Sequence, residues 1–168
     1  SNIQKVIYFA CFLTTFVIFL FTIYNGSMSK KRGSEAKKSN SARNIVPVLG
    51  VKLDSSSRDS LLTRACAELR GESVKTNVSK PYFIVTPNPE IVYRASNDEK
   101  YRNVLNSADL AVIDGVGLAW AISGITQTTQ EVFPGRELVL EMVKYCAKNR
   151  LKVFLLGGAE GVAKRKAE

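Results

Sequence analysis

The sequence predicts an α/β fold: a parallel sheet with helices on both faces, preceded by one N-terminal transmembrane helix. Two observations predict it. After residue 44, short apolar runs alternate four times with helical patterns, and nearly unbroken apolar strands are typical of a parallel sheet covered on both faces. Before that, residues 6–24 contain no charged side chain. The expected architecture is therefore a Rossmann-like domain behind a membrane anchor.

The apolar segment from Val6 to Tyr24 has 19 residues, which as a helix would extend about 28 Å, close to the hydrocarbon thickness of a bilayer. A cleaved signal peptide and a buried helix are the alternatives. No Ala-x-Ala cleavage pattern follows the segment, and none of its faces is polar. Lys and Arg are more numerous after it than before it, which places the rest of the chain in the cytoplasm. We therefore expect a single-pass protein of the cytoplasmic membrane, with residues 1–28 as its anchor.

Residues 29–44 are rich in Ser, Lys and Asn and are predicted to form a basic flexible linker. Residues 1–43 carry seven Lys or Arg and one acid, so most of the net charge of +9 belongs to this region. Such a run either attracts anionic lipids or only sets membrane topology, and it does not indicate nucleic-acid binding. The chain has three cysteines without a Cys-x-x-Cys pair, and no histidine. This excludes a Ser-His-Asp triad and argues against a structural zinc site.

Residues 45–168 are predicted to form the folded domain. It begins with a strand over 45–51, where Pro47 suits a strand edge. A helix follows through Leu61 and Leu69, capped by residues 54–57 and ended by Gly71. Further strands are expected over 82–85, 110–113 and 153–156, with helices over 89–95, 98–105, 118–124 and 135–149 and from 160 onward. The chain stops in the first turns of that last helix, so we expect the domain to be incomplete at its C-terminus.

Two strand-to-helix turns carry the candidate site: Thr86-Pro87-Asn88-Pro89-Glu90 and Asp114-Gly115-Val116-Gly117. In a parallel sheet the carboxyl ends of the strands meet at one edge, where helix N-termini present free amides. Asp114 is the candidate general base, Thr86 and Asn88 are candidate substrate contacts, and Gly115 and Gly117 let a ligand approach the backbone. Each polar residue also has a structural interpretation, as the N-cap of the next helix or as a turn former.

Two other segments are candidates for ligand contacts. Gly157-Gly158 follows the last predicted strand and suits either a diphosphate at the next helix N-terminus or a tight turn. Arg136 and Glu137 are either ligand contacts or first-turn surface residues. Gly115-x-Gly117 matches part of a dinucleotide fingerprint, but Trp120 stands where its third glycine belongs. No Asp-x-Asp metal motif occurs, so amides and arginines would stabilise a leaving diphosphate, and no cofactor or metal is expected.

Five blocks in order resemble the WecG/TagA/CpsF glycosyltransferase family over residues 45–168. They are Thr86-Pro87-Asn88-Pro89-Glu90, Leu105-Asn106-Ser107-Ala108-Asp109-Leu110, Asp114-Gly115-Val116-Gly117, Pro134-Gly135-Arg136-Glu137-Leu138 and Val153-Phe154-Leu155-Leu156-Gly157-Gly158. The resemblance implies metal-independent, inverting transfer of an N-acetylmannosamine-type sugar from a UDP donor to a polyprenyl-diphosphate-linked sugar acceptor at the membrane. The pathway would build cell-surface polysaccharide such as teichoic acid.

By the same resemblance Asp114 would deprotonate the acceptor hydroxyl, Thr86 and Asn88 would position substrate, and the Gly157-Gly158 turn would lie near the nucleotide. The chain departs from the family in carrying Val132 and Phe133 where members often have a basic residue, and in lacking an arginine-bearing C-terminal region. A non-catalytic, membrane-tethered nucleotide-sugar-binding module and an NAD-type dinucleotide-binding protein remain alternatives. A homo-oligomer is compatible with the sequence, which defines no oligomeric state.

Overall fold

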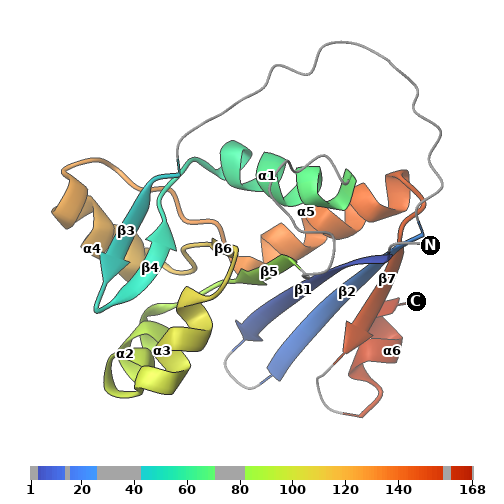
Figure 1. The fold of residues 1–168 in the computed structure, drawn as a ribbon, viewed down its shortest axis with the longest axis horizontal. Helices are drawn as coiled ribbons and strands as arrows, with labels where there is room; N and C mark the ends of the chain where they lie inside the picture. Colours follow the sequence, from blue (N-terminus) through green and yellow to red (C-terminus); the bar gives the residue numbers. More distant parts are fainter. Residues whose placement is uncertain (1–3, 14–15, 26–42, 71–81, 157–159, 168) are drawn as a thin grey trace.

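The computed structural model describes residues 4–13, 16–25, 43–70, 82–156 and 160–167 (Figure 1). Strands and helices alternate along most of this part of the chain. In order they are β1 (Gln4–Leu13), β2 (Phe16–Asn25), β3 (Ile45–Val48), β4 (Val51–Asp54), α1 (Arg58–Arg70), β5 (Tyr82–Val85), α2 (Pro89–Asn97), α3 (Glu99–Asn106), β6 (Leu110–Ala111), α4 (Val116–Thr126), α5 (Gly135–Lys148), β7 (Lys152–Leu156) and α6 (Val162–Ala167).

The main sheet is mixed, so the prediction of a parallel sheet is wrong. Its five strands lie in the order β6-β5-β1-β2-β7. The β6–β5 and β5–β1 pairs are parallel, whereas the β1–β2 and β2–β7 pairs are antiparallel. The parallel part is thus confined to one side, and β5 and β6 end at the same edge.

The predicted transmembrane helix is also wrong. Its segment forms β1 and β2, two antiparallel strands in register from Gln4↔Asn25 to Leu13↔Phe16. No helix within the described ranges combines the length and the apolar character needed to cross a membrane. A charge-free apolar run carries no periodicity that separates a helix from buried strands, and the Phe, Ile, Val and Tyr residues of this run all favour strands. The predicted linker over 29–44 lies outside the described residues, apart from its last two.

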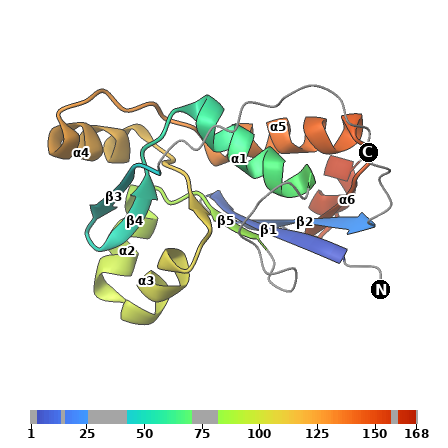
Figure 2. The same cartoon turned by 45° about the horizontal axis from the view of Figure 1, so that its top comes forward.

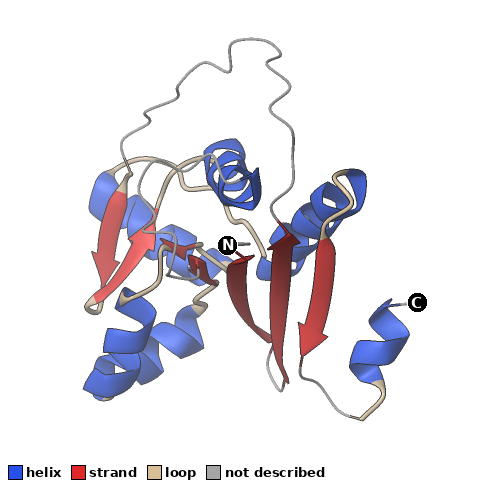
Figure 3. Cartoon of the chain, turned by 45° about the vertical axis from the view of Figure 1, so that its right-hand side comes forward, coloured by secondary structure: helices blue, strands red, loops and turns tan. Residues whose placement is uncertain are grey.

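The predicted strand over 45–51 is a β-hairpin. Leu49 and Gly50 turn the chain with positive φ angles of 47° and 81°, and β3 and β4 pair on either side of them. β4 then reaches the main sheet, because Asp54 forms a parallel bridge with Val112 just beyond β6. Figure 3 shows the hairpin beside this end of the sheet. The carboxyl end of β4 therefore joins the edge formed by β5 and β6.

Alternating residues of β5 and β6 divide the core into two parts. On one face, α1 and α5 lie side by side over the sheet (Figure 2). Their cluster consists of Leu61, Ala65, Leu69, Tyr82, Ile84, Leu110, Val112, Phe133, Leu138, Met142 and Cys146. The other cluster joins the hairpin with α2, α3 and α4: Val46, Val48, Val51, Leu53, Val85, Ile91, Val92, Ala95, Leu105, Ala111, Ile113, Leu118, Ala119 and Ile122. Neighbours such as Ile84 and Val85 belong to different clusters, as expected for consecutive residues of a strand that is covered on both faces.

Candidate functional site

Three strands deliver polar residues to one edge of the fold. Val85 leads into Thr86 at the end of β5, β6 leads through Ile113 into Asp114, and β4 ends at Asp54. Backbone hydrogen bonds hold these ends together: the Val112 N–H donates to the Val85 carbonyl (2.9 Å), and the Asp114 N–H donates to the Pro87 carbonyl (3.0 Å). The two predicted loops are therefore in direct contact.

Asp114 lies at the N-terminus of α5. The Gly135 N–H donates to Asp114 Oδ2 at 3.0 Å, and the carboxylate is partly exposed. Its alternative interpretation, as the N-cap of the following helix, is wrong: Gly115 occupies the cap position of α4, without a side-chain hydrogen bond. The amide end of a helix favours a negative charge beside it. The contact also fixes the orientation of the carboxyl group at the sheet edge.

The glycines after Asp114 let the two loops pack closely. Gly115 has a φ of 106°, which other residues rarely adopt. A Cβ atom there would lie 3.3 Å from Pro89 Cδ, and one on Gly117 would lie 3.2 Å from Pro89 Cγ. Both positions are tighter than ordinary side-chain contacts. In this structure the two glycines accommodate the neighbouring loop, and their predicted contact with a ligand stays a prediction.

Thr86 is almost completely buried, at 2% exposure. Its Oγ1 atom has no hydrogen-bond partner among the described residues. Leaving a buried hydroxyl unpaired costs about 1–3 kcal/mol, so the free protein carries a polar atom that a ligand or water could satisfy. The role predicted for Thr86 in substrate positioning is untested by this geometry, which places the side chain at the correct edge but out of contact with solvent.

The remaining predicted residues divide into four cases. Asn88 caps α2, since its Oδ1 accepts from the Ile91 N–H at 2.9 Å, which is its structural interpretation. Arg136 is exposed in the first turn of α5. Glu137 Oε2 pairs with Arg58 Nη1 of α1 at 2.6 Å. Gly157 and Gly158 lie outside the described residues.

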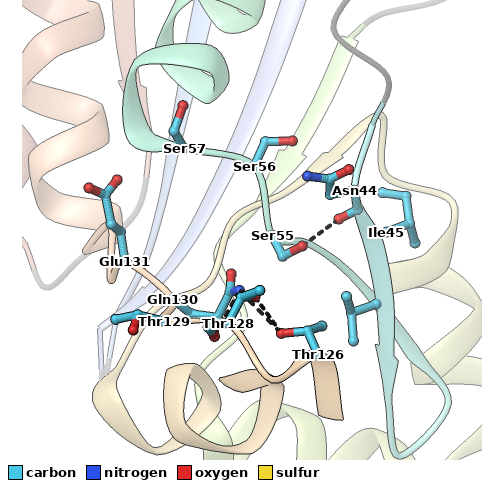
Figure 4. Close-up of a pocket in the computed structure, with 11 residues that line it drawn as sticks. Asn44, Ile45, Ser55, Ser56, Ser57, Thr126, Thr128, Thr129, Gln130 and Glu131 are labelled. Carbon is cyan, nitrogen blue, oxygen red and sulfur yellow. Dashed lines mark hydrogen bonds between the residues drawn. The ribbon is translucent and has the colours of Figure 1, made fainter. Parts of the chain in front are cut away.

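A pocket of about 580 Å³ lies beside this edge, and the sequence reasoning missed it. It lies between the start of β3, the segment entering α1 and the loop that leads from α4 to α5 (Figure 4). Eleven residues line it, nearly all of them polar: Asn44, Ile45, Val46, Ser55, Ser56, Ser57, Thr126, Thr128, Thr129, Gln130 and Glu131. The run of three serines directly after a strand was the signal that could have found it.

The loop that closes this pocket also leads to Asp114. Phe133 N–H donates to the Ile113 carbonyl at 3.2 Å, one residue before Asp114. Arg58 holds the other side of this loop. Its backbone N–H donates to Glu131 Oε2 (3.2 Å), and its guanidinium lies 4.4 Å from the centre of the Phe133 ring. Arg58 of α1 therefore places a positive charge beside Phe133, although Val132 and Phe133 themselves are uncharged.

Other groups are poorly placed to act as the base. Burial raises the pKa of Tyr82 to about 12, so this phenol keeps its proton at neutral pH, and it lies at the amino end of β5. Cys66 and Cys146 are buried in the helical layer. In the described ranges no three His, Cys, Asp or Glu side chains gather where they could hold a metal ion. Of the two carboxylates at the strand ends, Asp54 is buried and paired with Arg64, whereas Asp114 is partly exposed and is therefore better placed for proton transfer.

Comparison with known proteins adds a family to this geometry. Residues 46–168 match the model of the Glycosyl transferase WecG/TagA/CpsF family. The chain is also similar to proteins named N-acetylglucosaminyldiphosphoundecaprenol N-acetyl-beta-D-mannosaminyltransferase from Staphylococcus aureus, strains NCTC 8325 and COL. Each is 33% identical over 126 residues, which cover 75% of this chain and 47% of the relative. The chain therefore spans about half the length of the curated relatives it matches.

Proposed function

Because this chain belongs to the WecG/TagA/CpsF glycosyltransferase family, we propose that it transfers an N-acetylmannosamine-type sugar from a UDP donor to a polyprenyl-diphosphate-linked sugar acceptor in cell-surface polysaccharide synthesis. The single observation that carries the proposal is the coincidence of the family match with the sheet edge: residues 46–168 contain β4, β5, β6 and Asp114. The names of the matched relatives supply the sugar and the acceptor class.

The proposed reaction is a single displacement. The acceptor hydroxyl attacks the anomeric carbon of the donor sugar, the bond from that carbon to the UDP oxygen breaks, and Asp114 takes the hydroxyl proton. UDP leaves with the bonding electron pair. Attack from the opposite side of an α-linked donor gives a β-linkage, which agrees with the beta-D-mannosaminyl group in the name of the relatives.

The leaving diphosphate needs positive charge or amide donors. Arg58 and Arg136 are the arginines that the described structure brings to the N-terminal region of α5, and we assign them this role without a metal ion. The hydroxyl-lined pocket suits the polar groups of a sugar or nucleotide, since side-chain hydroxyls both donate and accept hydrogen bonds. The protein would act at the cytoplasmic face of the membrane, where its lipid acceptor resides.

A transfer assay tests the proposed function. The full-length protein is incubated with UDP-N-acetylmannosamine and a lipid-diphosphate-linked N-acetylglucosamine, with and without EDTA. We expect equal amounts of UDP and disaccharide product, unchanged by the chelator. Binding of UDP without turnover would instead support a non-catalytic module, and displacement of UDP by NAD would support a dinucleotide-binding protein.

Thr86→Val is expected to separate stability from activity. Removing an unpaired buried hydroxyl should raise the free energy of unfolding by about 1 kcal/mol. If that hydroxyl forms a hydrogen bond with substrate, kcat/KM should fall about tenfold. Urea unfolding and the transfer assay measure the two quantities. Thr86→Ser keeps the hydroxyl and should keep the activity, and Thr63→Val, at an exposed position of α1, is the matched control. Wild-type kcat/KM in Thr86→Val would remove Thr86 from the site.

A further inference from the structure

Helix α4 differs in charge from every other long helix of the described structure. It follows the Asp114-Gly115 turn, and no charged residue occurs anywhere in residues 115–130. Leu118, Ala119 and Ile122 face the core. By contrast, the exposed positions of α5 are mostly charged and include Arg136, Lys144 and Lys148.

The opposite face of α4 exposes large apolar side chains. Trp120 is 74% exposed, Ile125 is 59% exposed and Val116 is 57% exposed. The exposed small residues Gly117, Ala121 and Gly124 follow a spacing of four and three, so they form a row along the helix, with Val116 and Trp120 on one side of the row and Ile125 on the other. At 1.5 Å per residue, the helix extends this apolar face for about 16 Å. An apolar face that no described residue covers is typical of a binding surface.

The apolar face of α4, defined by Val116, Trp120 and Ile125, begins at the candidate site. Val116 is two residues after Asp114, and Gly117 packs against Pro89 of the neighbouring loop. A ligand whose polar end lies at Asp114 can therefore continue directly onto this face. Figure 1 shows α4 at the periphery of the molecule, where a long chain has access to it.

We propose that the apolar face of α4 binds the first isoprenoid units of the lipid acceptor, with the diphosphate-linked sugar held at Asp114. The identity of this ligand rests on the proposed function. Two features favour a single lipid chain over other occupants. Helices that lie on an anionic bilayer carry Lys or Arg on their polar face, and α4 has none. One helix with three large apolar side chains also offers far less than the roughly 800 Å² per partner of a stable protein interface.

Trp120 is the only tryptophan within residues 1–168, and the difference in fluorescence between the protein and its Trp120→Phe variant reports on this face alone. Titrating the full-length protein with farnesyl diphosphate should shift the emission to shorter wavelength and protect it from iodide quenching. Inorganic diphosphate should do neither. Val116→Ser/Ile125→Ser keeps the reporter and should weaken the affinity about tenfold. Leu140→Ser, which removes an exposed leucine from α5, is the matched control and should leave the titration unchanged.

Three outcomes would overturn the inference: no spectral change with farnesyl diphosphate, an equal change with vesicles of phosphatidylcholine alone, or a change that follows protein concentration without lipid. The last two would assign the face to a bilayer or to a second copy.

Activity separates this inference from the proposed function. Trp120→Ser should raise the KM of a long-chain acceptor about tenfold and leave that of a short, soluble acceptor unchanged. Equal changes for both acceptors would refute isoprenoid binding while transfer itself stands. A normal fluorescence titration without transfer to either acceptor would refute the proposed function alone.

Discussion

Replacing Asp114 by asparagine is expected to lower the rate of sugar transfer by about 10²–10⁴-fold, the usual contribution of a positioned general base. The fold should survive, because the amide oxygen of asparagine can still accept the Gly135 N–H bond that Asp114 Oδ2 accepts at 3.0 Å. What disappears is the capacity to take a proton. The transfer assay measures the rate, and a thermal melt shows whether the variant is folded.

Asp98→Asn is the matched control for this substitution. Asp98 also accepts one backbone N–H at a helix N-terminus, from Tyr101 at 2.9 Å, but it caps α3 rather than lying among the carboxyl ends of β4, β5 and β6. Asparagine is an equally good cap, so transfer should stay at the wild-type rate. An Asp114→Asn variant with undiminished turnover would exclude this carboxylate as the base.

The turn at Asp114 was predictable because its signal is local. An apolar run that ends in Asp-Gly before a helical pattern specifies both the strand end and the tight turn, and the contact with the Pro87 loop follows from parallel pairing of β5 and β6. The contribution of β4 was not predictable in the same way. Its bridge from Asp54 to Val112 joins residues 58 positions apart, and the hairpin turn at Leu49 places a non-glycine residue at positive φ, which the sequence does not signal.

The prediction for the N-terminal segment was wrong for a different physical reason. Hydrophobicity alone separates buried from exposed chain, not a helix from a strand. Residues 6–24 contain no charged side chain and are apolar on every face, whether they form a helix or a strand. The prediction of a bilayer-spanning helix therefore rested on the length of the segment alone. In the structure β1 and β2 pair with β5 and β7, which lie far away in sequence. Tertiary pairing of this kind overrides a prediction that rests on length.

The largest effect on stability is expected from Arg64→Met. Arg64 Nη2 lies 2.8 Å from Asp54 Oδ2, and the Asp54 side chain is only 1% exposed. Removing the cation leaves a buried carboxylate without its counter-charge, which costs about 3–5 kcal/mol of unfolding free energy. Urea denaturation measures the loss. Because Asp54 also accepts the Ser56 N–H at 3.0 Å, the start of the serine segment that lines the pocket should loosen with it.

The double variant Asp54→Asn/Arg64→Met identifies the cause of this loss. With both charges absent, no buried ion is left unpaired, so most of the lost stability should return. Lys144→Met breaks a pair of similar length, 2.9 Å to Glu141, at an exposed position, and should cost less than about 1 kcal/mol. If Arg64→Met cost no more than Lys144→Met, the pair would contribute little, and apolar packing alone would hold β4 against β6 at the candidate site.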